Sequence, residues 1–329
     1  MKNICKKLAL LGIPLLLYLC FFAAFEPNNY FGLRAASGST QPIARIRAYE
    51  AAPGANLILG DSRMAHFDIA LADEASGKTW QNLAFGGASL RETIDLANYV
   101  LDSGNEVDEM VIGLSFYTLN AKYDTDRMSA LQDTLHNPLA YVFNLEYNVN
   151  TLTSFTNWLL WARQRAAGQT AQSWAEAQQE SETGDWAAAD YIGPGGTSYA
   201  LHAKLAEYPA VIMEKCEGWA LNAEMVSALE TLAARCQSRG VKLALVFPPM
   251  ADNVRDEVCV PLGIDRQMAD FLPMLEGWKA TYGVTLLDYE WTDRPDFDDD
   301  RQFYDGFHLD TVYGLPEWTQ TLFASVGAT

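Results

Sequence analysis

The strongest signal for the architecture is the run Ala55-Asn56-Leu57-Ile58-Leu59-Gly60-Asp61-Ser62-Arg63. Its first five residues form a short apolar segment, which predicts a buried β-strand. Its last four residues include a glycine and an aspartate, which favour a sharp turn where the strand ends. A turn in that position can hold the hydroxyl of Ser62 at the edge of a sheet.

A second segment supplies a candidate base for that hydroxyl. Far downstream the chain reads Asp305-Gly306-Phe307-His308. A serine hydroxyl is a weak nucleophile until a base takes its proton, and His308 can serve as that base. Asp305 would then hold the imidazole in the correct tautomer. His66 is an alternative base, although a packing role suits it better. Together the two segments indicate a serine-dependent acyl-transfer enzyme, or a relic of one.

Further apolar segments alternate with helical ones along the chain. Strands are predicted at residues 55–59, 81–84, 110–114, 241–247 and 284–287. Between the second and third, Ser89-Leu90-Arg91-Glu92 forms a capping box that opens a helix. Short apolar strands separated by helices predict an α/β fold, in which a five-stranded parallel sheet is covered by helices on both faces. Active sites of such sheets lie at the carboxyl ends of the strands, which is where Ser62 is placed.

The N-terminus predicts a membrane anchor. Residues 8–25 are uncharged and apolar, and as a helix they would span about 27 Å, close to the thickness of a bilayer core. Lys2, Lys6 and Lys7 precede this run and Glu26 follows it, so the N-terminus should be cytoplasmic and the rest extracytoplasmic. A cleaved signal peptide is the alternative. The length of the apolar run and the absence of a clean small-residue cleavage site favour an uncleaved single-pass anchor.

The domain boundaries follow from these signals. We predict an anchor over residues 1–25, a juxtamembrane linker over 26–54 and one domain over 55–329, interrupted by a helical insertion at about 121–215. The insertion is predicted to be helical because apolar residues recur in it at helical spacing. These residues are Leu152, Phe155, Leu159 and Ala162, with Trp158 and Trp161 widening the face. Its aromatic residues either fill the insertion's own core or line a substrate groove.

Composition limits the partners. The 329 residues are 49% hydrophobic and carry a formal net charge of -19. The hydrophobic content suits a sizeable core, and the acidity argues against nucleic acid as a partner. A polyanionic glycan would be repelled on average, unless a local basic patch overrules the net charge. The five cysteines have no zinc spacing, and buried or unpaired thiols are favoured for Cys216, Cys236 and Cys259.

The ordered motifs resemble a known family. Gly60-Asp61-Ser62, then Gly86-Gly87, then Asp305-x-x-His308 are similar in order and spacing to the SGNH (GDSL-type) hydrolase superfamily, over residues 55–315. With Arg63 after the serine and an N-terminal anchor, the chain resembles the membrane-anchored SGNH-like proteins that O-acylate teichoic acid and alginate-type polysaccharides. This resemblance implies a flavodoxin-like sheet, an extracytoplasmic Ser-His-Asp site and a membrane-bound O-acyltransferase as partner.

The tetrahedral intermediate of acyl transfer needs hydrogen-bond donors for its oxyanion. The backbone N–H groups of Ser62 and Gly87 are the expected pair. The third motif of the family usually offers Gly-x-Asn-Asp, but this chain has Gly113-Leu114-Ser115-Phe116-Tyr117 there. Ser115 could replace the asparagine as a donor. Arg63 could bind an anionic group of the substrate, or it could pair with a nearby carboxylate.

These observations predict a membrane-anchored, extracytoplasmic serine esterase or O-acyltransferase that acts on a cell-envelope glycan through an acyl-serine intermediate. No metal and no organic cofactor is implied. The alternative is a catalytically degenerate scaffold that binds glycan or docks a membrane-bound O-acyltransferase. A plain extracellular esterase that works without a partner is a third hypothesis.

Overall fold

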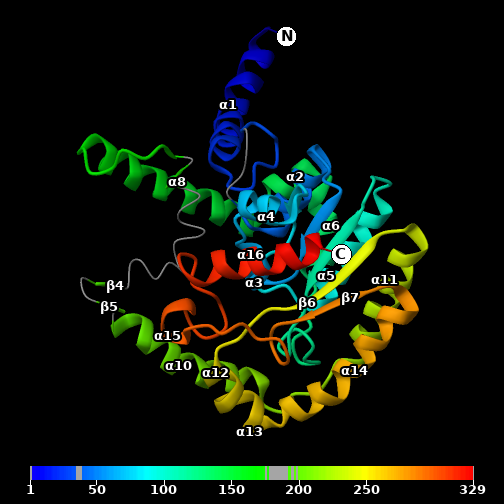
Figure 1. Ribbon diagram of the computed structural model, residues 1–329. Coiled ribbons are helices and arrows are strands. Elements are labelled where there is room, and N and C mark those ends of the chain that lie inside the picture. The colour runs from blue at the N-terminus through cyan, green and yellow to red at the C-terminus, as the bar shows by residue number, and fades with distance from the viewer. Residues whose placement is uncertain are drawn as a thin grey trace. The chain divides into compact units, whose positions relative to one another are not determined.

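The computed structural model of the chain describes residues 2–34, 39–174, 176–177, 192–193, 196–197 and 199–328. A five-stranded parallel sheet lies at the centre of its larger unit, which confirms the predicted α/β fold (Figure 1). The strand order is β2-β1-β3-β6-β7. Counted along the sheet's own strands this is 2-1-3-4-5, the flavodoxin-like order. The strands are β1 (Asn56–Leu59), β2 (Trp80–Asn82), β3 (Glu109–Gly113), β6 (Lys242–Phe247) and β7 (Thr285–Asp288).

The three interior strands β1, β3 and β6 are mainly apolar because both faces of the sheet are covered. Leu57, Ile58 and Leu59 of β1 are fully buried. In the register of the sheet, Ile58 lies opposite Asn82 of β2 on one side and Val111 of β3 on the other. Strand β1 is therefore an interior strand, and the turn that follows it opens beside the carboxyl end of β3.

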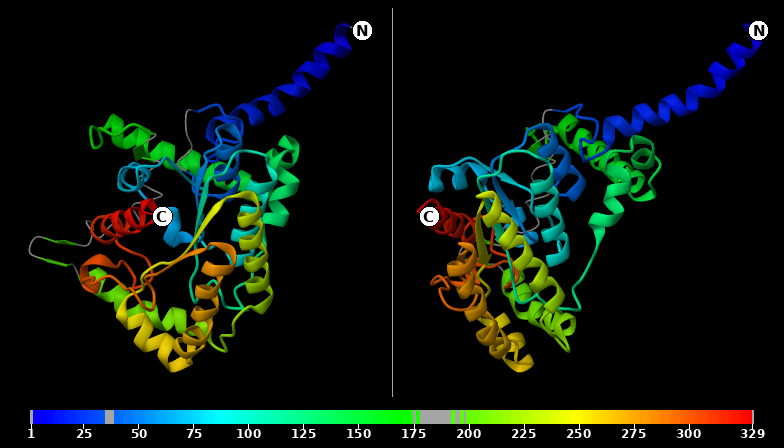
Figure 2. Two further views of the ribbon diagram at one scale, coloured as in Figure 1. Left: turned by 45° about the vertical axis from the view of Figure 1, so that its right-hand side comes forward. Right: turned by 90° about the vertical axis from the view of Figure 1, so that its right-hand side faces the viewer.

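Helices cover the two faces in separate groups, and Figure 2 shows the sheet between the red α16 helix and the yellow-green α11 helix. One group contains α4 (Ile69–Ser76) and α16 (Gly314–Gly327), which pack against each other. The other contains α5 (Leu90–Asp102), α11 (Ala223–Arg239) and α14 (Ile264–Tyr282). The α5 helix begins with the predicted capping box, in which Ser89 and Glu92 bond each other's backbone N–H groups.

The remaining elements are shorter or lie outside the sheet. They are α1 (Lys2–Phe25), α2 (Pro42–Ala51), α3 (Ser62–Ala65), α6 (Arg127–Leu135), α7 (Pro138–Val142), α8 (Leu145–Ala166), β4 (Ile192–Gly193), β5 (Gly196–Thr197), α10 (Tyr199–Cys216), α12 (Asp252–Val254), the π-helical turn η3 (Arg255–Cys259), α13 (Val260–Leu262) and α15 (Asp299–Gln302).

The chain divides into two units. The smaller unit contains Met1–Ala48 and Ser129–Glu182, and the larger contains Tyr49–Met128 and Thr183–Thr329. This division differs from the predicted anchor, linker and inserted domain. Most of the predicted linker lies in the same unit as α8. Glu26 of that segment is buried, and its carboxylate accepts a hydrogen bond from the Tyr141 hydroxyl at 2.9 Å.

The smaller unit is held together by aromatic packing between α1 and α8. Phe25 of α1 contacts Phe155 and Trp158 of α8, with ring centroids 4.9 Å and 5.5 Å apart. Leu152 and Leu159 of α8 remain 56% and 42% exposed. The apolar stripe expected on this helix is therefore only partly buried.

The predicted membrane anchor and the cysteines can be compared with the described residues. Across those residues no helix combines the length and apolarity that a bilayer span requires, so the predicted anchor stays a prediction. Cys20, Cys216, Cys236 and Cys259 are free, and the last three are buried, which agrees with the expectation of buried thiols.

Candidate active site

The turn after β1 is shaped so that Ser62 stands at the carboxyl end of the sheet. Gly60 has a φ of +139°, a conformation that glycine adopts readily and other residues rarely do. A Cβ atom at Gly60 would lie 2.8 Å from Cγ of Met64. Asp61 then caps the short α3 helix, because its Oδ1 accepts the backbone N–H of Arg63 at 3.0 Å. Ser62 follows this cap as the first residue of α3.

The segment before α16 places the histidine and aspartate on one turn. Oδ1 of Asp305 accepts the backbone N–H groups of Phe307 and His308, at 3.0 Å and 2.7 Å. Oδ2 of the same carboxylate lies 2.8 Å from Nδ1 of His308. The carboxylate therefore fixes both the backbone turn and the orientation of the imidazole.

The two segments meet in the folded chain. Ser62 Oγ lies 2.7 Å from Nε2 of His308, although the residues are 246 positions apart. Both ring nitrogens of His308 have a hydrogen-bond partner when the Ser62 hydroxyl donates to Nε2 and Nδ1–H donates to Asp305. His66, the alternative base, instead ends the α3 helix. The structure thus brings together Ser62, His308 and Asp305, the three residues that the sequence pointed to.

The electrostatics suit a charged carboxylate behind the imidazole. Burial by itself would raise the pKa of Asp305. The charge of His308 and the hydrogen bonds from its ring and from the backbone outweigh burial, so the pKa of Asp305 lies below its ordinary value. Asp305 therefore stays ionised where it can stabilise an imidazolium.

The turn that carries Gly87 is clamped from behind. The guanidinium of Arg127 donates to the carbonyl oxygens of Gly86 and Gly87, at 3.2 Å and 2.7 Å. The same group is paired with the fully buried carboxylate of Glu92, at 2.8 Å. The Tyr123 hydroxyl also donates to the Gly87 carbonyl, at 2.7 Å. With its carbonyls held, the turn presents the backbone N–H of Gly87 in a fixed direction.

Ser115 is committed elsewhere. It is fully buried, its Oγ accepts the backbone N–H of Thr118 at 3.0 Å, and that oxygen lies 3.3 Å from Oγ1 of Thr118. These bonds form a local turn after β3. The hydroxyl proposed as a substitute for the family's asparagine is therefore used to shape the backbone.

Arg63 adopts the second of its two expected arrangements, in which it pairs with carboxylates. Its side chain is 3% exposed and donates to Glu290 at 3.2 Å, with Asp61 at 3.6 Å. Its guanidinium also lies over the ring of Phe307, 4.1 Å from the centroid. The substrate-binding role predicted for Arg63 does not fit a guanidinium enclosed in this way. The residue instead links the serine turn to the histidine turn.

Glu290 was not singled out from the sequence. Besides Arg63, its carboxylate accepts the backbone N–H of Phe116 at 3.1 Å and the indole N–H of Trp291 at 2.8 Å. Burial raises the pKa of Glu290 to about 7, against the opposing charge of Arg63. The residue joins loops that follow β1, β3 and β7. Its position two residues after Asp288, at the end of a predicted strand, could have indicated that Glu290 lies near the site.

Aromatic side chains flank the pair of segments. The ring of Tyr208, from α10, lies 6.4 Å from the His308 ring, and Tyr117 lies 5.7 Å from Phe307 and 4.4 Å from Tyr123. Burial raises the pKa of Tyr208, with the charge of Asp305 adding to the effect, so the phenol stays neutral. These tyrosines came from the predicted insertion and from the loop after β3, where spacing alone gave no signal.

Comparisons with known proteins add little. No protein-family model matches the chain, and no curated protein matches it. Among solved structures, the chain is similar to a Streptococcus pneumonia protein that is provisionally described as a platelet activating factor. The identity is 11%, the match covers 86% of this chain and 91% of that chain, and the TM-score is 0.38. A likeness of this size carries no argument about activity.

Proposed function

We propose that this chain is a serine-dependent esterase or O-acyltransferase of the SGNH type. One observation carries the proposal: the Ser62 hydroxyl, the His308 imidazole and the Asp305 carboxylate form one continuous hydrogen-bonded series. The series lies at the carboxyl end of β1 in a flavodoxin-like sheet, where ligands of such sheets bind. Such a series is the arrangement that turns a serine into a nucleophile.

The first half-reaction acylates the enzyme. Ser62 Oγ attacks the carbonyl carbon of an ester donor, and its proton passes to Nε2 of His308. Asp305 stabilises the imidazolium that results. When the tetrahedral intermediate collapses, the bond to the leaving oxygen breaks. His308 gives its proton to that oxygen, so the donor leaves as an alcohol and the acyl group remains on Ser62.

The second half-reaction transfers the acyl group. A hydroxyl of a sugar, or water, loses its proton to His308 and attacks the acyl-serine carbonyl. Collapse of the second intermediate returns the proton to Ser62 Oγ and releases an ester or a carboxylic acid. In both halves we assign oxyanion stabilisation to the backbone N–H groups of Ser62 and Gly87. The clamp of Arg127 on the carbonyls of the Gly87 turn supports that assignment.

The proposed acceptor is a cell-envelope glycan, as the sequence motifs suggest. The half-buried rings of Tyr208 beside His308 and of Tyr117 beside Phe307 support a substrate with apolar and hydroxyl-bearing faces. Because the chain carries a net charge of -19, an uncharged stretch of glycan fits better than a polyanionic one.

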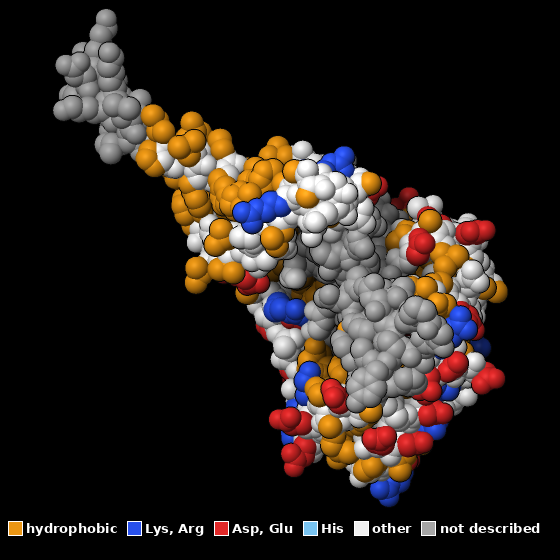
Figure 3. Space-filling model, turned by 90° about the vertical axis from the view of Figure 1, so that its left-hand side faces the viewer, with side chains coloured by type: hydrophobic (Ala, Val, Ile, Leu, Met, Phe, Trp, Pro, Cys, Tyr) orange, Lys and Arg blue, Asp and Glu red, His pale blue; other side chains and the backbone are white. Residues whose placement is uncertain are grey.

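We also propose that α1 holds the protein at a membrane, facing a membrane-bound O-acyltransferase. Leu15, Leu16 and Leu17 of this helix are 51%, 60% and 64% exposed. Figure 3 shows hydrophobic side chains along the described part of this helix. Membrane fractionation tests the point: the wild type should sediment with membranes and need detergent for release. If a Leu16→Glu/Leu17→Glu variant sediments just as fully as the wild type, these side chains do not anchor the protein.

The catalytic proposal is tested by labelling and by acylation. A fluorophosphonate probe should label the wild type, and Ser62→Ala should abolish that labelling. In a strain that carries the gene, Ser62→Ala should also remove the glycan O-acylation that depends on it. Thr156→Ala, a substitution on the exposed surface of α8, serves as the control and should change neither result. Unchanged acylation in Ser62→Ala would remove the nucleophile from the mechanism.

A second candidate function has one observation in its favour. Because Ser115 is committed to its own turn, its hydroxyl does not supply the donor that the family's asparagine gives. A scaffold that binds glycan or docks an acyltransferase would need no such donor. For a scaffold, His308→Ala should leave acylation in the strain intact, whereas the enzyme should lose it.

A further inference from the structure

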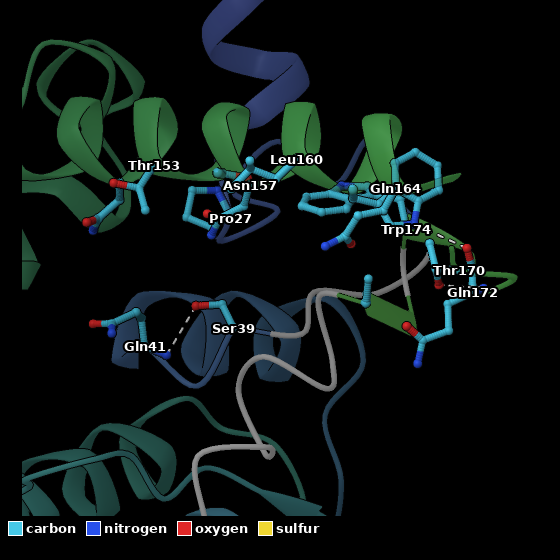
Figure 4. Close-up of a pocket in the computed structure, with 14 residues that line it drawn as sticks. Pro27, Ser39, Gln41, Thr153, Asn157, Leu160, Gln164, Thr170, Gln172 and Trp174 are labelled. Carbon is cyan, nitrogen blue, oxygen red and sulfur yellow. Dashed lines mark hydrogen bonds between the residues drawn. The ribbon is translucent and has the colours of Figure 1, made fainter. Parts of the chain in front are cut away.

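The smaller unit contains a cavity of about 500 Å³ that the catalytic proposal does not use. Figure 4 shows it between α8 and the segment that leads into α2, with Thr153, Asn157 and Gln164 projecting from α8. Ser39 and Gln41 lie on the opposite side. The volume falls in the usual range for small-molecule sites, about 300–1,000 Å³.

One face of α8 is built for this cavity. Its lining residues recur every three or four positions, which places them on a single side of the helix. They are Asn150, Thr153, Ser154, Asn157, Leu160, Trp161 and Gln164. The opposite side carries Phe155 and Trp158, which pack on α1. The face of α8 that lines the cavity is therefore distinct from the face that packs on α1.

The described lining combines uncharged polar groups with apolar ones. Of the 14 described residues around the cavity, none carries a charged side chain. Amides and hydroxyls dominate, and each of these groups can both donate and accept hydrogen bonds. The indole rings of Trp161 and Trp174 add apolar faces, with centroids 5.8 Å apart and planes inclined by 53°. Such a surface matches a ligand that has many hydroxyls and apolar C–H faces.

The aromatic end of the cavity is held in place before any ligand binds. The indole N–H of Trp161 donates to the Gln172 carbonyl at 3.2 Å. Arg165 donates to the carbonyls of Ala171 and Gln172, at 2.7 Å and 2.8 Å, and its guanidinium lies 5.8 Å from the Trp161 ring centroid. The segment that carries Trp174 is thereby tied to the end of α8. A preorganised wall reduces the entropy lost on binding.

We propose that this cavity binds an uncharged oligosaccharide. A charged ligand would find no counter-charge among the lining side chains that the structure describes. An apolar ligand would leave several amides without partners, which costs free energy for each buried group. A neutral sugar chain meets both conditions, since its hydroxyls pair with the amides and its C–H faces lie on the tryptophans. That the sugar comes from the envelope glycan acylated by Ser62 rests on the proposed function, whereas the binding itself does not.

Calorimetric titration of the full-length protein, purified in mild detergent, tests the binding. The probes are four neutral tetrasaccharides, namely cellotetraose, maltotetraose, mannotetraose and chitotetraose, with tetragalacturonate and the chitosan tetramer as charged counterparts. At least one neutral probe should bind, and the charged probes should bind at least about tenfold more weakly. If the folded protein binds no neutral probe at millimolar concentration, or prefers a charged one, the proposal is overturned.

Variants assign the binding to the cavity. Trp174→Ala and Gln164→Leu should each weaken binding about tenfold or more, and Trp174→Phe, which keeps a ring, should weaken it less. The matched control is Thr156→Ala, on the same helix but outside the lining, which should bind like the wild type. Circular dichroism confirms that each variant is folded. If Trp174→Ala and Gln164→Leu both bind the sugar as tightly as the wild type, the sugar binds elsewhere and the proposal is overturned.

Ser62→Ala separates this inference from the catalytic one. This variant should bind the neutral probe as tightly as the wild type, because the residue lies in the other unit. If binding is retained while Ser62 proves unreactive to fluorophosphonate, the cavity stands and the catalytic proposal fails. If Ser62 is labelled and no neutral probe binds, the catalytic proposal stands and the cavity proposal fails.

Discussion

At the scale of single residues, Asp305 has the most demanding position. Its two carboxylate oxygens accept two backbone N–H groups and face the imidazole. In Asp305→Asn, the side-chain amide would present a donor to Nδ1 and favour the wrong tautomer of His308. We expect kcat for ester turnover to fall about 10³- to 10⁴-fold, as in other triads. Steady-state turnover of a small acetyl ester measures this, and a loss below tenfold would contradict the assigned role.

Arg127 is expected to act on the rate through the Gly87 turn. Arg127→Lys keeps a positive charge near Glu92 but loses the planar fork that reaches both glycine carbonyls. We expect kcat to fall about 10- to 100-fold, less than the roughly 100- to 1000-fold that follows the outright loss of an oxyanion donor, while KM changes little. Arg91→Lys, at a partly exposed ion pair with Asp124, is the matched control and should leave kcat unchanged. A change confined to KM would mean that Arg127 serves substrate binding instead.

Some site residues were predictable from the sequence and others were not. Ser62, Asp305 and His308 were visible because each follows a local pattern: a strand-to-turn junction, or an Asp-x-x-His spacing. Arg127 and Glu290 belong to no such pattern, since their partners lie 35 and 227 positions away. Ser115 was expected at the site because of its place after β3, but its nearest partner in space is Thr118, which competes for the same hydroxyl.

At the scale of elements, the β1–α3 junction depends on one glycine. Gly60→Ala would place a Cβ 2.8 Å from Met64 Cγ and 3.2 Å from the Gly113 backbone, at a φ of +139°. Strain and overpacking together should lower the free energy of unfolding by about 2–4 kcal/mol. The control is Gly104→Ala, at a φ of +78° with open space around it, which should cost about 1 kcal/mol. Urea denaturation compares the two, and equal losses would show that the crowding at Gly60 is harmless.

Element boundaries show where local pattern gives way to packing. The second strand was predicted over residues 81–84, and it runs over Trp80–Asn82. Beyond it the backbone still bonds to the first strand, since Leu83 donates to Ile58 and Phe85 donates to Gly60. The hydrogen bonding between the second strand and the first therefore continues beyond Asn82, the last residue of β2. On α8, helical spacing was correct, but it could not tell which apolar positions meet α1 and which stay exposed.

At the scale of the whole molecule, the buried pair of Glu290 and Arg63 joins loops from three strands and should influence global stability. Because the pKa of Glu290 is raised from 4.5 to about 7, the folded state holds this proton where the unfolded state has lost it. The stabilising contribution is therefore complete below about pH 4.5 and is lost as the pH rises through about 7.

Urea unfolding of the wild type and of Glu290→Gln between pH 4.5 and 8 tests this linkage. The difference in the free energy of unfolding between the two proteins should shift against the wild type as the pH rises. The exposed Glu276→Gln is the matched control and should track the wild type across the range. A difference that stays constant with pH would show that Glu290 titrates normally in the fold.

The division into two units was beyond the reach of sequence reasoning. The alternation of apolar strands and helices was enough to predict the parallel sheet, because each strand and its covering helix are neighbours along the chain. The smaller unit combines Met1–Ala48 with Ser129–Glu182, two stretches far apart in sequence. Its aromatic contacts join Phe25 to Phe155 across 130 positions, and no local periodicity reports such a pairing.

The separation of Ser62 from His308 also has a consequence for biogenesis. As the polypeptide leaves the ribosome, the nucleophile emerges some 246 residues before its base. Until His308 has been synthesised and has folded against Ser62, the serine lacks the imidazole that would take its proton. A nascent polypeptide that has not yet reached His308 would therefore lack the proposed reactivity.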